Sequence, residues 1–304
     1  MAFPAAAKTI FHAAADLSGS DTAPSIHFPT AARERIAVAS YPFRNFIAGL
    51  DDAPGSTGKK MDIKDFTAHI AAKFNVNKIE PWSRHFRSTD RKYLDEVRAG
   101  AGKVHGLIVD IAADGEHSQY SADRGERDKA VAFGKQWIDV AAVVGAPSVR
   151  TNIPGAKDSK PDVARAAESL RRVADYAASK NVVVHLENDN PVSEDPFFIV
   201  EVVAKVNSPW LHALPDFANS LTTGNEERAY KGIDAMFAQA YGICHVKAME
   251  ANDAGQVFKV DMTKTFGMLK SHGYKGYCSM EFDSPGDPYA GTQDLIDTTL
   301  KYLA

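Results

Sequence analysis

The fold of this 304-residue chain is decided by four stretches of its second half: VVVHLEND (182–189), LHALPDFANS (211–220), ICHVKAME (243–250) and YCSMEFD (277–283). Each begins as an apolar run typical of a strand. Near its end each carries one side chain that can bind a metal: Glu187, Asp216, His245 and Glu281. These residues are 29, 29 and 36 positions apart. One strand-plus-helix unit of a (β/α)8 barrel takes roughly 30 residues, so the spacing predicts four consecutive barrel strands.

The rest of the chain continues the alternation. Strands are expected at Ile36–Ser40, Val76–Glu80, Val104–Ile111, Ser148–Asn152, Val182–Glu187, Leu211–Leu214, Ile243–Lys247 and Tyr277–Glu281. The clearest helical pattern is Pro161–Ser179. Eight strands alternating with helices predict an α/β chain folded as a (β/α)8 TIM barrel. We expect one barrel domain over 33–304, a partly ordered arm over 1–32, and the Gly-rich loop Ile47–Lys60 on the C-terminal face.

The period of two along a strand tells which side chains share a face. In the fifth, seventh and eighth strands one face is wholly apolar and suits the helix layer. The other face then directs five polar side chains into the lumen: His185, Glu187, His245, Lys247 and Glu281. With Asp216, this gives three carboxylates and one imidazole, a ligand set for a divalent metal. Without a cation, such a buried cluster would be costly.

Composition excludes several classes of function. The net charge of −4 and the pI near 6.2 give no field that attracts nucleic acid or a membrane surface. Cys244 and Cys278 lie in apolar runs and are expected to be buried thiols. Neither a membrane span nor a clear signal peptide is recognisable. The expected location is cytoplasmic, with export of a longer precursor left open, and a homo-oligomer is possible.

A family resemblance is carried by KIEPW (78–82), HLEND (185–189), LPDFANS (214–220), CHVKAM (244–249) and GYKGYCSMEFD (273–283). In this order the segments resemble the xylose isomerase-like TIM barrel superfamily, the sugar phosphate isomerase/epimerase type. The resemblance implies one divalent metal bound by Glu187, Asp216, His245 and Glu281. Mn2+ is the first choice, with Mg2+, Co2+ and Zn2+ possible. It also implies that Glu187 and Glu281 exchange protons with the substrate.

Two positions depart from the family pattern. Asn219 stands where the sixth-strand motif commonly has a His, and Lys247 and Met249 follow His245 where a further His or Arg is frequent. Because the family uses these positions to contact substrate, a standard ketohexose epimerase is in doubt. Lys247 could hold a carboxylate or polarise a carbonyl, or it could form a lumen salt bridge with Glu281 or Asp283.

Other side chains are expected at the same rim and are candidates for substrate binding. Trp82 could stack on a sugar or plug the barrel mouth, and Glu80 and His85 flank it. His85 could carry a proton or contact a hydroxyl. Arg150 suits a planar anion or a lumen ion pair, and His185 could contact substrate or metal-bound water. Asn219 and Lys247 complete the set.

The predicted function is a metal-dependent isomerase or epimerase of a sugar or keto-sugar. A carboxylate on each side of the substrate would remove and return a proton, through an enediolate that the metal stabilises. A lyase or dehydratase acting on a keto-sugar or keto-glycoside is an alternative, because elimination begins with the same proton abstraction. A distant alternative is an endonuclease IV-like DNA repair enzyme, which shares the barrel but uses three metals and more histidines.

Overall fold

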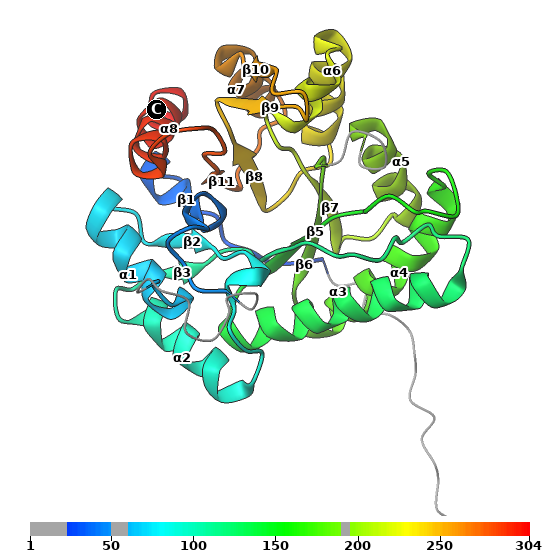
Figure 1. The fold of residues 1–304 in the computed structure, drawn as a ribbon, viewed down its shortest axis with the longest axis horizontal. Helices are drawn as coiled ribbons and strands as arrows, with labels where there is room; N and C mark the ends of the chain where they lie inside the picture. Colours follow the sequence, from blue (N-terminus) through cyan, green and yellow to red (C-terminus); the bar gives the residue numbers. More distant parts are fainter. Residues whose placement is uncertain (1–22, 50–59, 190–194) are drawn as a thin grey trace, which may run out of the picture.

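In the described part of the chain, a ring of parallel strands surrounded by eight α-helices forms the body of the molecule (Figure 1). The computed structural model describes residues 23–49, 60–189 and 195–304. The (β/α)8 TIM barrel predicted from the sequence is confirmed. Residues 1–22 of the predicted arm and 50–59 of the predicted loop lie outside the described residues. The division into an arm and a single domain from residue 33 stays a prediction.

The strands are hydrogen-bonded in the orders β3-β2-β1-β11-β8 and β4-β5-β6-β7, all parallel. They are β1 Ile36–Ala39, β2 Lys78–Glu80, β3 Leu107–Ile108, β4 Ala112–Ala113, β5 Ser148–Thr151, β6 Val183–Glu187, β7 Leu211–Leu214, β8 Ile243–Val246 and β11 Tyr277–Met280. Backbone bridges join the two groups at Asp216 with His245 and at Trp82 with Ala112. The ring is therefore closed on both sides.

All eight α-helices have Asp or Asn as the N-cap residue. They are α1 Ile63–Phe74, α2 Arg91–Gly102, α3 Arg124–Val144, α4 Val163–Lys180, α5 Pro196–Val206, α6 Glu226–Phe237, α7 Met262–Ser271 and α8 Pro288–Leu303. In every helix except α2 the capping side chain accepts a hydrogen bond from a backbone N–H of the first turn. Local sequence therefore fixes where each helix begins. None of the described helices is long and apolar enough to cross a membrane.

Several predicted boundaries differ from the structure by one or two residues, and the third strand differs more. The third strand, expected over Val104–Ile111, is two short pieces, β3 and β4. The chain first turns through His105, whose φ of 51° is left-handed, so extended backbone begins only at Leu107. It then changes partner: the N–H of Val109 still donates to β2, whereas the carbonyl of Ile111 accepts from β5. Helix α4 begins after Pro161, because Asp162 caps it by accepting from the N–H of Arg165 at 2.9 Å.

The N-terminal end of the barrel is covered by the chain segment that precedes β1. The ring of Phe28 packs edge-to-face on Tyr241 and Tyr277, with centroids 5.4 and 5.7 Å away. Tyr241 Oη donates to the carbonyl of Pro24 at 3.1 Å. Packed aromatic rings therefore cover part of this end, and the metal-type side chains described below lie at the opposite, C-terminal end.

An antiparallel hairpin, β9 Met249–Ala251 with β10 Val257–Lys259, follows β8. The strand spacing of the sequence does not predict this hairpin. It rises beside the C-terminal end of the barrel between β8 and α7 (Figure 1). It supplies part of the wall of the site described below.

Stability should depend on the protonation of His212, a residue of β7 that stacks on Tyr241 with centroids 4.8 Å apart. Burial lowers the pKa of His212 from 6.5 to about 4. Between these values the unfolded chain binds more protons, so the free energy of unfolding should fall as pH falls, by about 2 kcal/mol in all. His212→Phe keeps a stacking ring and should show a flatter profile. Urea denaturation from pH 7 to pH 4 measures the difference, and parallel profiles would contradict it.

Candidate metal centre and active site

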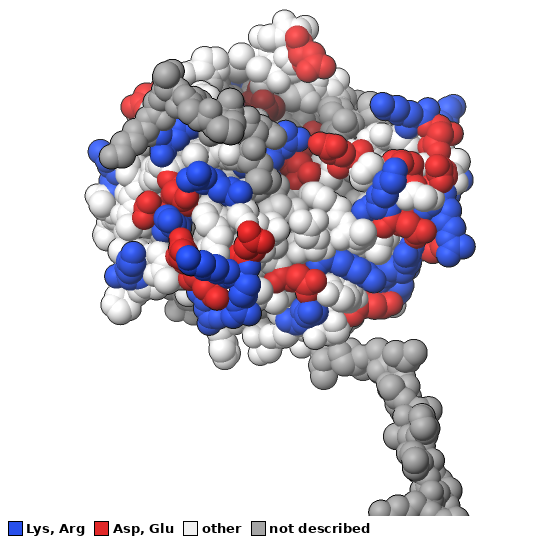
Figure 2. Space-filling view, turned by 60° about the horizontal axis from the view of Figure 1, so that its bottom comes forward, with Lys and Arg blue, Asp and Glu red and all other residues white. Residues whose placement is uncertain are grey.

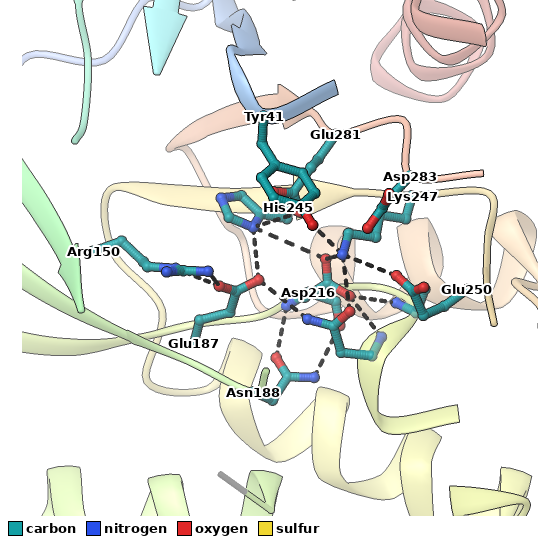
Figure 3. Close-up of polar contacts among 12 residues, drawn as sticks. Tyr41, Arg150, Glu187, Asn188, Asp216, His245, Lys247, Glu250, Glu281 and Asp283 are labelled. Atoms are coloured by element: carbon teal, nitrogen blue, oxygen red, sulfur yellow. Dashed lines mark hydrogen bonds and ion pairs between the residues drawn. The ribbon is translucent and has the colours of Figure 1, made fainter. Parts of the chain in front are cut away.

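Four side chains converge at the C-terminal mouth of the barrel. Glu187 ends β6, His245 lies in β8, Asp216 follows β7, and Glu281 directly follows β11 (Figure 3). One potential ligand atom of each lies within 4.8 Å of the others, and all four residues are buried. The barrel therefore brings together the four residues that the sequence spacing singled out.

His245 shows its two ring nitrogens to different neighbours. Nδ1 lies 2.8 Å from Glu187, 3.2 Å from Glu281 and 4.0 Å from Asp216. Nε2 lies 2.9 and 3.0 Å from the two oxygens of Glu80. Nδ1 is thus the atom that could bind a metal together with the carboxylates. A proton on Nε2, donated to Glu80, would fix that tautomer, as carboxylates do behind many metal-binding histidines.

The two carboxylate oxygens of Asp216 differ: one accepts hydrogen bonds from the backbone, and the other accepts none in the described structure. Its Oδ1 accepts from the N–H groups of Ala218 and Asn219 at 2.8 and 2.7 Å. Asn188 fixes the backbone here, because its Oδ1 accepts from Asp216 N at 2.8 Å. Oδ2 is buried and accepts no hydrogen bond within the described residues. Such an atom is costly unless a cation compensates it, and three carboxylates with one imidazole suit Mn2+ or Mg2+. The donor set thus fits a divalent metal.

Burial and neighbouring cations shift the pKa values of the three carboxylates of the cluster. Burial raises the pKa of Asp216, to about 7. Burial would also raise the pKa of Glu187, but Arg150 and His245 outweigh it and lower the value to about 2. Burial opposes ionisation of Glu281 too, yet Lys247 and His245 hold its pKa well below the usual range. Cations beside the two glutamates therefore keep both ionised.

Lys247 and Arg150 are bound by the acids around them. Lys247 Nζ donates to Asn219 Oδ1 at 2.9 Å and lies 3.1 Å from both Glu250 and Glu281. Asn219 Nδ2 in turn donates to Glu187 at 3.3 Å. The guanidinium of Arg150 pairs with Glu187 and with Asp114. Lys247 thus forms the expected ion pair with Glu281, and its contact with substrate stays a prediction.

A cavity of about 580 Å³ opens above the cluster. Six of the predicted site residues line it: Trp82, Arg150, Glu187, Asn219, Lys247 and Glu281. Asp216 and His245 are fully buried and do not line it, but their ligand atoms lie within 4.8 Å of those of the lining residues Glu187 and Glu281. The predicted substrate-binding residues Glu80, His85 and His185 do not line it.

The three residues outside the lining contact other parts of the barrel. Glu80 stands behind His245. His85 Nδ1 forms a hydrogen bond with Ser40 Oγ at 2.8 Å, and its ring packs on Trp82.

His185 is fully buried. Its Nε2 accepts a hydrogen bond from Gly242 N at 3.2 Å, so its Nδ1 carries the proton and donates to Asp110 Oδ1, 3.1 Å away. A Cβ on Gly242 would lie 2.6 Å from this ring. The expectation that His185 contacts substrate or metal-bound water is therefore corrected, because protein groups use both nitrogens.

Residues of the cavity wall that the sequence did not single out include Tyr41, Asp114 and Glu250, and Asp283 was expected only as a partner of Lys247. Tyr41, Asp114 and Asp283 lie within three residues of the ends of β1, β4 and β11, whereas Glu250 lies on β9. Trp82 Nε1 donates to Asp114 Oδ2 at 2.6 Å. The position after a strand was the available signal, but it does not tell an acid at the rim from one in solvent.

Glu80→Ala should weaken metal binding without removing a ligand, because the ring of His245 would lose the acceptor that orients it. We expect a fall in affinity of about 10- to 100-fold. Glu80→Gln keeps an acceptor oxygen and should lie between this variant and the wild type. Titration with Mn2+ followed by electron paramagnetic resonance measures the series. Equal affinities in all three proteins would show that Glu80 does not position His245.

Comparison of the sequence with models of known protein families identifies the family of this chain. The model of the xylose isomerase-like TIM barrel family matches residues 68–303. The chain belongs to this family. The resemblance inferred from the strand-end motifs is confirmed. No curated protein sequence matches the chain.

Structures with the same fold include sugar epimerases. D-psicose 3-epimerase from Clostridium cellulolyticum H10, determined with D-tagatose, has a TM-score of 0.66 at 16% identity, over 88% of this chain and 99% of that one. A xylose isomerase-like TIM barrel protein from Mycobacterium smegmatis, in complex with magnesium, gives 0.64 at 16%, over 90% and 99%. The 3-keto-D-glucoside 4-epimerase of E. coli gives 0.61 at 13%, over 87% and 98%. At these identities the likeness shows the fold.

Proposed function

We propose that this protein is a divalent-metal-dependent isomerase or epimerase of a sugar or keto-sugar. The observation that carries the proposal is the buried cluster of Glu187, Asp216, His245 and Glu281, of which Glu187 and Glu281 line an open cavity. Two proteins with the same fold, a D-psicose 3-epimerase and a 3-keto-D-glucoside 4-epimerase, are named for substrates of this class. We propose Mn2+ or Mg2+ as the metal; a magnesium complex is known for a protein of the same fold.

The two glutamates are the proposed acid–base pair. They come from β6 and β11, which are separated around the ring by β7 and β8, and they approach the cluster from different sides (Figure 3). Arg150 and Lys247 hold them ionised, so either can take a proton from a substrate carbon and return it. A divalent ion, when bound, would supply Lewis-acid polarisation of a substrate carbonyl. Asn219 joins Glu187 and Lys247 and keeps both side chains in place.

A nucleic acid substrate is not proposed, because the cavity is lined with carboxylates. A phosphodiester backbone would need basic contacts. Lysine and arginine are interspersed with acids over the face seen in Figure 2 and form no continuous basic stripe there. Within the described residues, one group of His, Asp and Glu side chains could bind a metal. An endonuclease IV-like enzyme would use three metals.

Metal-loaded protein should catalyse exchange of a substrate C–H proton with deuterated solvent. Ketoses and keto-glycosides are incubated in D2O with Mn2+ or Mg2+, and the loss of one proton signal is followed by NMR. Chelation should abolish the exchange and added metal should restore it. Exchange that survives chelation, or none with any ketose or keto-glycoside, would contradict the proposal. An eliminated group among the products would assign the lyase reaction instead.

A further inference from the structure

The wall of the cavity has a strong excess of negative charge. Seven of its residues carry a carboxylate: Asp114, Glu187, Asp189, Glu250, Asp253, Glu281 and Asp283. Two described lining residues, Arg150 and Lys247, are cationic. A divalent metal would add two positive charges, which still leaves the acids in excess. An anion entering the cavity therefore meets a repulsive field.

Both cations of the wall are already paired with carboxylates. An ammonium has three N–H donors, and Lys247 has three near acceptors: Asn219 at 2.9 Å and both Glu250 and Glu281 at 3.1 Å. Arg150 is shared between Glu187 and Asp114. A phosphate or carboxylate of a substrate would have to displace one of these acids.

Glu250 is the acid that masks Lys247 from the cavity side. It lies on β9, in the hairpin that walls the cavity, and its other oxygen accepts from the N–H of Ala251 at 2.9 Å. Glu281, by contrast, belongs to the metal cluster. Glu250 is not one of the four cluster residues, and its ion pair occupies Lys247 within the cavity wall.

We propose that the cavity selects an uncharged polyhydroxy substrate and rejects phosphorylated or carboxylated sugars, with Glu250 as the residue that determines this specificity. The inference rests on the proposed function, because it names the substrate class of the same site. The neutral part of the wall suits such a ligand: Tyr41, Trp82, Asn219, Thr222 and Asn252 offer hydroxyl, amide and aromatic groups.

The first test compares neutral ketoses with their phosphate esters. D-fructose and D-tagatose, and the 6-phosphate of each, are titrated into the magnesium-loaded full chain by calorimetry at low salt. A ketose that binds should do so at least about 100-fold more tightly than its ester, the penalty expected from like charges. An ester that binds as tightly as its parent sugar would overturn the proposal.

The second test does not depend on turnover or on the correct sugar. Binding of inorganic phosphate to the magnesium-loaded chain is measured by equilibrium dialysis. The wild type should bind none at millimolar concentrations. Glu250→Gln combined with Asp283→Asn should gain binding by at least about tenfold, because two negative charges are removed from the cavity wall, one of them the ion-pair partner of Lys247. The exposed Glu201 of α5 provides the matched control, Glu201→Gln, which should behave as wild type.

The outcomes separate the two proposals. Phosphate binding by the wild type, or its absence in the double variant, overturns the specificity assigned to Glu250. Failure of proton exchange with every neutral ketose and keto-glycoside counts against the proposed function, while the phosphate result still stands as a measure of the charge of the cavity.

Discussion

Glu187→Gln and Glu281→Gln are each expected to slow exchange of the substrate C–H proton by about 100- to 10,000-fold, the usual contribution of a positioned acid or base. Each Gln keeps an oxygen that can bind the metal but loses the basicity. The expectation follows from their placement on β6 and β11 and from the cations that keep both carboxylates ionised. NMR in D2O gives the rate.

Two controls make that comparison decisive. Metal content is measured on each variant, so that loss of the ion is not mistaken for loss of the base. Glu201→Gln on the outside of α5 removes a charge remote from the cavity and should exchange at the wild-type rate. If both site variants keep their metal and exchange normally, the base lies elsewhere, and Lys247 is the next candidate in the cavity wall.

Asp216→Ala is expected to abolish tight metal binding. Loss of a group that only hydrogen-bonds to a metal ligand lowers metal affinity about 10- to 100-fold. Asp216 would supply a ligand oxygen directly, so its loss should have a larger effect. Its Oδ2 lies 3.7 Å from the ammonium of Lys247 and accepts no hydrogen bond in the described structure. Elemental analysis after dialysis should find about one ion per wild-type chain and almost none in the variant. An unchanged content would reject Asp216 as a ligand.

The strand-end residues could be predicted because two regularities of the barrel appear directly in the sequence. The unit length of roughly 30 residues placed Glu187, Asp216, His245 and Glu281 on successive strands. The period of two then put three of them on the lumen face. Neither regularity depends on the substrate. Both can therefore be recognised even where the sequence identity to proteins of the same fold is low.

Depth within the barrel could not be predicted in the same way. His185 shares a face with Glu187, but two residues of strand place it about 6.6 Å nearer the N-terminal end. There it bonds to Asp110 and Gly242 and does not reach the cavity. Glu80 likewise faces the lumen, yet His245 stands between it and the cluster. Periodicity gives the side of a strand, whereas the neighbours across the barrel decide what the side chain contacts.

The contribution of Glu250 was hidden for a different reason. It lies on a short hairpin inserted after β8, outside the repeating unit. The sequence indicated that Lys247 could pair within the lumen, and the structure shows Glu281 in that role. Asp283, the other sequence candidate, pairs with Arg44 at 3.0 Å instead. Partner choice among several nearby acids depends on backbone geometry that strand patterns do not encode.

The central claim is that one divalent metal is bound by four named side chains at the mouth of the barrel. Anomalous diffraction from a crystal of the Mn2+-loaded protein tests it most directly. We predict a single anomalous peak per chain, bonded to Glu187, Asp216, Glu281 and Nδ1 of His245, with Nε2 still facing Glu80. A peak elsewhere, or no peak among these residues at saturating Mn2+, would contradict the account.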